Sequence, residues 1–122
     1  MAYGRHFGLG NVYLMKAKGN KFKVGSSRKP KQRLKQIKRK KPSTTLQRSF
    51  SAWEMNGAES AAQKALLKKG FKKVKRGPTE WFRKKPSTSW VNTEKIVQNS
   101  VYRHNSKQKR ILEVACLMYF LQ

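Results

Sequence analysis

Residues 11–25 read NVYLMKAKGNKFKVG, two apolar-rich runs on either side of Lys18-Gly19-Asn20. Glycine and asparagine at this position are typical of a tight turn, so the stretch predicts an antiparallel β-hairpin. A three-residue loop places Val12, Leu14, Phe22 and Val24 on one face and Tyr13, Met15, Lys21 and Lys23 on the other. A two-residue loop would mix lysine into both faces, because a slip of one residue turns every side chain over. We therefore expect the three-residue loop, with Tyr13 and Lys23 pointing the same way.

A helix is expected after the hairpin, over about residues 30–40. Pro30 suits the first helical position, and Pro42 stops the run. Leu34 and Ile37 form an apolar pair one turn apart, and Arg33 lies at the border of this apolar stripe.

A third strand and a second helix follow. Residues 44–53 alternate Leu46, Arg48, Phe50 and Ala52 with Gln47, Ser49, Ser51 and Trp53. This alternation predicts a half-buried strand. Asn56 and Glu59 form a capping-box pattern that opens a helix ending at Gly70. The expected fold class is therefore α/β (α+β), a small three-stranded antiparallel sheet flanked by helices.

The pattern becomes irregular beyond Gly70. Asn92 or Thr93 is positioned to cap a further helix, and the basic stretch 103–110 indicates a linker or a frayed helix end. Residues 111–122 are apolar all round, which for a helix implies burial in the core or against a second copy. We expect an N-terminal arm at 1–10, one folded domain at 11–102, and a basic linker with an apolar C-terminal segment at 103–122.

The composition is strongly basic. The 122 residues include 30 Lys and Arg against 5 Glu and no Asp, a formal net charge of +25. Such an excess favours a polyanionic partner, first of all nucleic acid. The 37% of hydrophobic residues argue against a wholly disordered tail.

The sequence also bears on location. The longest apolar run, 114–121, is far shorter than the ~20 residues of a membrane span. The N-terminus lacks a secretory pattern, and Cys116 alone forms neither an internal disulfide nor a cysteine zinc cluster. An intracellular protein is expected, in the cytoplasm or, for a eukaryotic or viral protein, in the host nucleus.

Four short motifs occur in a fixed order: Gly10-Asn11-Val12-Tyr13, Phe22-Lys23-Val24-Gly25-Ser26, Arg33-Leu34 and Glu80-Trp81-Phe82. This order resembles the GIY-YIG endonuclease superfamily, and more narrowly its phage- and virus-borne branch often labelled a DNA-binding domain. The resemblance covers about residues 11–82. It implies a three-stranded antiparallel sheet with helices on its faces, and metal-dependent cleavage of a phosphodiester at that sheet.

The resemblance also implies roles for single residues. Tyr13 matches the tyrosine that positions or deprotonates the attacking water. Lys23 stands where the second motif usually has tyrosine, and a lysine there would offset charge on the scissile phosphate. Arg33 matches the helix arginine, whose guanidinium suits two phosphate oxygens.

Glu80 is the expected metal ligand, because Mg²⁺ or Mn²⁺ needs oxygen ligands and the chain has only five carboxylates. Glu59 is interpreted as a capping residue instead. Asn92 matches an asparagine that relatives often carry after the acid, although a helix cap explains it equally well.

Basic side chains before the acid and on the first helix are candidates for nucleic-acid contact: Lys35, Lys38, Arg39, Lys40, Lys41, Lys68, Lys69, Lys72, Lys73, Lys75 and Arg76. Contacts of this kind are made to phosphates and carry little sequence information. The sequence does not distinguish DNA from RNA as the partner.

Three functions are consistent with these patterns. The first is a small Mg²⁺-dependent DNA endonuclease of the GIY-YIG type. The second is a nucleic-acid-binding module that has kept the fold without the chemistry. The third is a membrane-surface or virion structural protein. The oligomeric state is open, with residues 111–122 as the candidate dimer contact.

Overall fold

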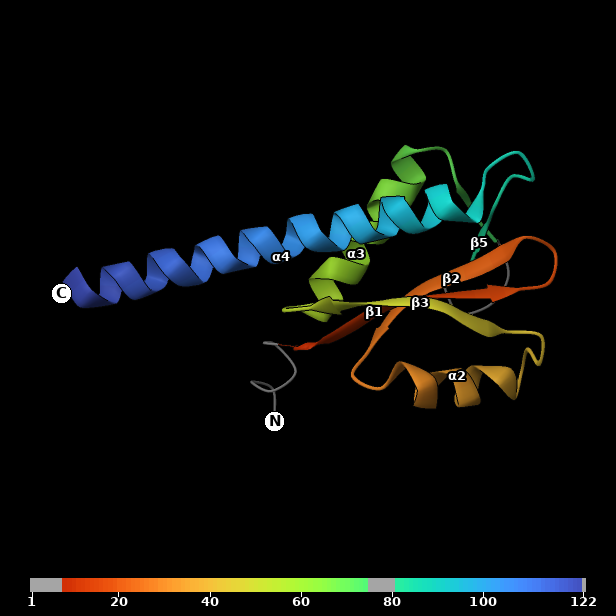
Figure 1. Ribbon diagram of the computed structural model, residues 1–122, viewed down its shortest axis with the longest axis horizontal. Helices are drawn as coiled ribbons and strands as arrows, with labels where there is room; N and C mark the ends of the chain where they lie inside the picture. Colours follow the sequence, from red (N-terminus) through yellow and green to blue (C-terminus); the bar gives the residue numbers. More distant parts are fainter. Residues whose placement is uncertain (1–7, 75–80, 122) are drawn as a thin grey trace.

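The computed structural model describes residues 8–74 and 81–121, which form a mixed α and β fold (Figure 1). Five antiparallel strands make one sheet in the order β3-β1-β2-β5-β4. They are β1 (Gly10–Ala17), β2 (Lys21–Ser27), β3 (Thr45–Ala52), β4 (Lys72–Lys73) and β5 (Trp81–Arg83). The helices are α2 (Pro30–Lys38), α3 (Met55–Lys68) and α4 (Trp90–Leu121). Helix α2 lies on one side of the sheet, and α3 and α4 lie on the other.

The hairpin has the predicted register. Ala17 pairs with Lys21 across the three-residue loop, and Leu14 pairs with Val24. Asn20 in this loop adopts φ 57°, a left-handed conformation that asparagine tolerates better than most residues. Because the loop length was predicted correctly, so were the two faces of both strands.

The main core lies between the sheet and helices α3 and α4. It consists of buried side chains from β1, β2, β3, β5, α3 and α4: Val12, Leu14, Phe22, Val24, Phe50, Ala52, Ala58, Ala62, Leu66, Phe82, Val97 and Val101. The rings of Phe22 and Phe82 are stacked, with centroids 5.5 Å apart. Tyr13, Met15 and Lys23 are buried on the opposite face of the sheet, which α2 covers.

Two expectations about the sheet were wrong. The sheet has five strands and not three, because β4 and β5 are only two and three residues long and show no alternation in the sequence. In β3 the register shifts opposite Leu14 and Met15, so that Arg48 pairs with Leu14 but Leu46 pairs with Met15. Leu46 and Phe50 therefore lie on opposite faces, whereas strict alternation placed them on the same one.

The prediction of a linker at 103–110 was also wrong. Residues 90–121 form one continuous helix that projects well beyond the sheet (Figure 1). Two polar side chains of this stretch hold α4 against the corner between β3 and α3. Asn105 accepts a hydrogen bond from the Trp53 amide at 3.1 Å and donates one to the Ser51 carbonyl at 3.0 Å. His104 lies 3.2 Å from the Glu54 carboxylate.

The apolar end of α4 does not enter the core of the chain. Its large side chains, including Ile111, Leu117 and Tyr119, are exposed, the last to 76%. Cys116 is exposed as well. Within the described ranges, no helix combines the length and the hydropathy needed to cross a lipid bilayer.

A chain that ends at Arg110 should keep the stability of the full chain. Its free energy of unfolding is expected to change by less than about 0.5 kcal/mol, because the described side chains at 111–119 and 121 are exposed. Val101→Ala, which opens a cavity in the core, should cost about 2 kcal/mol in the same urea titration. A loss on truncation that grows with protein concentration would instead show that a second copy covers residues 111–121.

Candidate functional site

Tyr13 and Arg33 meet on the side of the sheet that α2 covers. Tyr13 is almost completely buried, at 1% exposure, and its hydroxyl interacts with the Arg33 side chain. Pro30 begins α2, and the Arg33 amide donates to the Lys29 carbonyl at 3.1 Å. The Arg33 guanidinium also donates to Gln36 at 2.8 Å, one turn further along the helix. The guanidinium is thus held beside the tyrosine hydroxyl, as the family resemblance implied.

The environment of Tyr13 keeps its hydroxyl protonated. Burial raises the pKa of Tyr13 above its ordinary value of 10.0, since a phenolate would be poorly solvated there. The hydrogen bond and the positive charge of Arg33 lower this pKa, and the negative charge of Glu59 raises it, without reversing the direction set by burial. At neutral pH the group is therefore a neutral phenol that can donate or accept a hydrogen bond.

One of the four tyrosines should therefore ionise later than the others in a spectrophotometric titration. Tyr13→Phe should remove that late phase, and Arg33→Gln should move it to still higher pH. When folding raises the pKa of a group, its contribution to stability is fully present at pH values below the pKa in the unfolded chain. The contribution is lost as the pH rises through the pKa in the folded protein. The unfolding free energy should accordingly fall in alkali, less steeply in Tyr13→Phe. A wild-type titration in a single step near pH 10 would contradict the assignment.

Helix α3 brings a carboxylate toward this site. The amide of Gln63 donates to the Val24 carbonyl at 3.0 Å, and the Ser26 hydroxyl donates to Asn56 at 3.3 Å. These contacts hold one face of α3 against residues 24–26 of β2. Strand β5 pairs with residues 21–23 of β2, so α3 contacts the part of β2 that follows this pairing. Glu59 lies between Asn56 and Gln63 at helical spacing, and its charge reaches the Tyr13 hydroxyl.

The capping role expected for Glu59 was therefore wrong. Helix α3 begins at Met55 and is capped by Glu54, whose carboxylate accepts from the Gly57 amide at 2.7 Å. Sequence reasoning did not place Glu59 near Tyr13, because the Asn56-to-Glu59 spacing imitates a capping box. The signal that identifies it is the polar series Asn56, Glu59 and Gln63, which follows one face of the helix.

Lys23 lies on the same face of the sheet as Tyr13, beside a tryptophan. It is 8% exposed and pairs with Trp81 of β5. The Lys41 ammonium lies 4.7 Å from the centroid of the Trp81 ring. A cavity of about 160 Å³ separates Trp81 from α2 and is lined by Arg33 and Lys41. Helix α2 and the segment directly after it thus bring basic groups to one small hollow, which Trp81 of β5 closes on the other side.

A row of cations crosses the sheet on this face. Lys21 of β2, Arg83 of β5 and Lys72 of β4 are paired in register, so their side chains lie on the same face, two positions along β2 from Lys23. Sequence reasoning placed Lys21 on this face but missed the row and Arg83, because β5 is too short to be recognised as a strand. Lys73 alternates to the opposite face, where its ammonium lies 5.9 Å from the Phe82 ring centroid.

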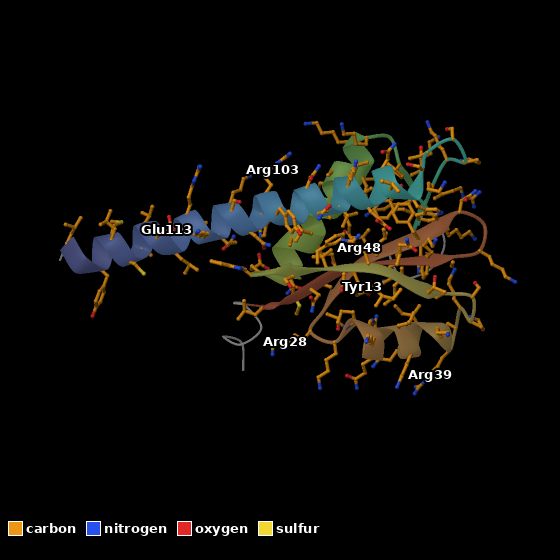
Figure 2. The ribbon with its side chains drawn as sticks, viewed as in Figure 1. Tyr13, Arg28, Arg39, Arg48, Arg103 and Glu113 are labelled. Atoms are coloured by element: carbon orange, nitrogen blue, oxygen red, sulfur yellow. The ribbon has the colours of Figure 1, made fainter. Side chains whose placement is uncertain are left out.

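The other predicted residues are placed as follows. Figure 2 shows basic side chains on separate parts of the fold, among them Arg39 just after α2 and Arg103 on α4. The predicted contacts Lys35, Lys38, Arg39 and Lys40 are exposed on α2 or just after it. Glu80, Lys75 and Arg76 lie outside the described residues, so the metal-ligand prediction for Glu80 stays a prediction.

The structure does not bring Asn92 to Tyr13 and Arg33. Asn92 belongs to α4, on the other side of the sheet, where it lines a groove between α3 and α4. It is not the helix cap either, because its amide donates to the Ser89 hydroxyl at 3.1 Å. Ser89 therefore caps α4, and neither role predicted for Asn92 is supported by its position.

The described residues do not form a preformed metal cage. Among residues 8–74 and 81–121, no three His, Cys, Asp or Glu side chains gather into a group that could hold a metal ion. Mg²⁺ is often held by one or two carboxylates, with water and substrate phosphates as its remaining ligands. Glu59 near the Tyr13 hydroxyl fits that pattern.

Comparison with known proteins identifies one family. The family model of the T5orf172 domain matches residues 10–109, which include every strand and helix up to the distal part of α4. No curated protein and no solved structure matches the chain. Since the match spans well over half of the 122 residues, the chain belongs to the T5orf172 domain family.

Proposed function

We propose that this protein is a DNA-binding, Mg²⁺-dependent endonuclease that hydrolyses phosphodiester bonds on the α2 side of its sheet. The observation that carries the proposal is the contact of the buried Tyr13 hydroxyl with Arg33, within reach of the Glu59 charge. The T5orf172 family supports it as a phage-type domain related to nucleic acids. The net charge of +25 supports a polyanionic substrate.

Each side chain has a distinct task in this mechanism. The neutral Tyr13 hydroxyl orients the attacking water, since its raised pKa disfavours the phenolate that a general base would require. The Arg33 fork binds two phosphate oxygens and stabilises the charge that grows on them. Lys23, at 8% exposure, adds a poorly hydrated positive charge on the same face. Glu59 and Glu80 would hold Mg²⁺ or Mn²⁺, which would supply charge stabilisation at the leaving oxygen.

The DNA would lie across α2 and the row formed by Lys21, Arg83 and Lys72. These side chains, with the lysines of α2, present basic groups on the side of the sheet that carries Tyr13. If they neutralise ~6 phosphates, affinity should fall by ~10³ between 50 and 200 mM salt. This binding would be largely independent of base sequence.

A second candidate function is a binding module without cleavage. One observation favours it: lysine replaces the second-motif tyrosine at position 23. Such a module would bind nucleic acid through the same basic surface, and its affinity would depend on salt in the same way. It differs only in lacking turnover.

Supercoiled plasmid separates the two functions. The full chain is incubated with plasmid in Mg²⁺, Mn²⁺ or EDTA, and again as Arg33→Ala. The endonuclease predicts nicking that requires the metal and disappears in the variant. Tight gel retardation without nicking in any metal would overturn the endonuclease and support the binding module. Nicking that survives both EDTA and Arg33→Ala would indicate a contaminating nuclease.

A further inference from the structure

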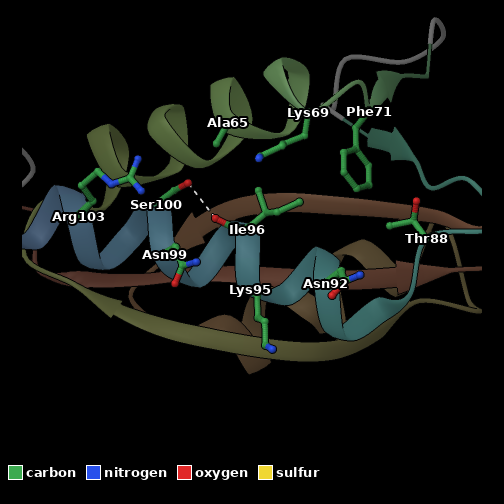
Figure 3. Close-up of a pocket in the computed structure, with 10 residues that line it drawn as sticks. All are labelled: Ala65, Lys69, Phe71, Thr88, Asn92, Lys95, Ile96, Asn99, Ser100 and Arg103. Atoms are coloured by element: carbon green, nitrogen blue, oxygen red, sulfur yellow. Dashed lines mark hydrogen bonds between the residues drawn. The ribbon is translucent and has the colours of Figure 1, made fainter.

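The groove between α3 and α4 is a second concave, basic surface, on the side of the sheet away from Tyr13. Its volume is about 530 Å³, within the range typical of small-molecule sites. Figure 3 shows Lys69 extending from the end of α3 toward the space that Arg103 enters from α4. The two cations thus approach one volume from opposite walls.

Helix α4 supplies one wall by its regular spacing. Asn92, Lys95, Asn99 and Arg103 recur at intervals of three or four residues, so they form one stripe along the helix. Lysine and arginine alternate here with asparagine, and an asparagine amide offers both a donor and an acceptor. The stripe therefore offers a ligand both positive charges and neutral hydrogen-bonding groups. A basic face that only contacts solvent would consist of charged residues alone.

The floor of the groove is apolar and includes one aromatic ring. Ala65 and Ile96 line it between the helices, and Phe71 closes one end. Phe71 packs edge to face on the core residue Phe22, with ring centroids 5.7 Å apart, so its ring is held in place. A flat heteroaromatic group could lie on this floor with its edge toward the amides of the α4 stripe.

The charge of the groove selects an anion. Within the described part of the chain, no carboxylate lines it. The acid of α4 that neighbours this stripe, Glu94, is engaged elsewhere, with Arg48 at 3.8 Å and with Gln47 at 2.7 Å. Lys69, Lys95 and Arg103 therefore present positive charge to any occupant without a competing acid in the wall.

We propose that this groove binds a nucleoside phosphate unit, with the base on the floor of Ile96 and Phe71 and the phosphate in the space between Lys69 and Arg103, where Lys95 at the outer rim adds to the positive charge. The bound group is either a free nucleotide or an unpaired nucleotide within a single strand. Both present a flat base and a phosphate to the groove. The site is separate from the proposed nuclease centre, and its occupancy is measured as binding, without cleavage.

The test is binding of deoxyadenosine monophosphate by calorimetry, and of a fluorescein-labelled ten-nucleotide oligothymidine by anisotropy, to the full chain at 200 mM salt. Lys95→Gln/Arg103→Gln removes two charges from the groove. Lys107→Gln/Arg110→Gln removes the same two kinds of charge from α4 outside it. Circular dichroism verifies that both variants are folded. We expect at least ~10-fold weaker binding in the groove variant only, because charge-assisted contacts to phosphate are lost.

Each outcome decides the proposal. Groove-dependent binding of the mononucleotide supports a free nucleotide as the source, and groove-dependent binding of the oligonucleotide alone supports an unpaired strand. Equal loss in both variants for both probes overturns the site and leaves nonspecific attraction. Deoxyribose 5-phosphate that binds as tightly as the mononucleotide overturns the nucleoside assignment. An acidic peptide that displaces the mononucleotide completely at equal concentration overturns it as well.

Discussion

Glu59→Gln should lower the rate of plasmid nicking on the order of 10²–10³-fold while the protein still binds the plasmid. The carboxylate lies close enough for its charge to act on the Tyr13 hydroxyl, and glutamine keeps its shape but removes the charge. Loss of one preorganised electrostatic partner at a reacting centre typically costs this much in rate. Affinity for DNA should stay equal or rise slightly, because a negative charge has been removed from a basic surface.

Glu113→Gln is the matched control. It changes the net charge by the same amount, but Glu113 lies on the distal part of α4 and is 63% exposed. Its nicking rate should equal that of the wild type. Glu80→Gln measures the other proposed ligand in the same assay. Wild-type nicking by Glu59→Gln, with loss only in Glu80→Gln, would show that Glu59 has no part in the chemistry.

The parts of the fold that were predicted correctly rest on long alternating or periodic patterns. The hairpin register followed from a single choice of loop length, because only the three-residue loop separates Leu14 and Val24 from Lys23. Both ends of α2 agree with prediction within two residues, since Pro30 and Pro42 constrain the helix on either side. Burial on one face is strongly encoded when a wrong register would place charge in the core.

The parts that were missed depend on contacts between distant segments. Strands β4 and β5 exist because the edge of β2 offers unpaired backbone groups at residues 21–23, a property of the folded sheet. Helix α4 continues through 103–110 because His104 and Asn105 reach the corner after β3. Neither partner is apparent from local composition, so short strands and polar helix contacts escaped sequence reasoning.

The candidate site was predicted only in part for the same reason. Tyr13 and Arg33 come together as the motif order implied, because the hairpin and α2 are consecutive elements. Glu59 belongs to a later helix, and its approach depends on Gln63 binding the Val24 carbonyl across 39 positions of the chain. Long-range anchoring of this kind leaves no local periodicity beyond a polar stripe on the helix.

Gly25→Ala is expected to destabilise the fold and to impair nicking together, although alanine is normally the better residue in a strand. Gly25 is the partner of Tyr13 across the hairpin, and the tyrosine ring lies over it. A β-carbon at this position would stand 2.5 Å from Cζ and 3.0 Å from Cε1 of Tyr13. The ring must therefore move, and α2 and the sheet leave a residue at 1% exposure little room to do so.

The sign of the stability change is the informative quantity. Without a clash, replacing glycine by alanine at ordinary backbone angles stabilises a protein by about 0.4–1 kcal/mol, because the unfolded chain loses freedom. With the clash, overpacking should cost about 1–3 kcal/mol. A displacement of the hydroxyl by about 1 Å should also slow nicking by ~10²-fold. Urea unfolding and the plasmid assay measure the two effects on the same preparation.

A double-mutant cycle assigns both effects to the tyrosine. In a Tyr13→Ala background the added methyl group meets no ring, so Gly25→Ala should there become neutral or stabilising. Tyr13→Leu offers a second background if the alanine variant does not fold, because leucine keeps part of the buried volume without a ring over position 25. If Gly25→Ala destabilised all three backgrounds equally, the cause would lie in the strand and not in the aromatic side chain. If Gly25→Ala destabilised only the protein that carries Tyr13, the glycine would be required for the position of that buried side chain beside Arg33 of α2 and Glu59 of α3.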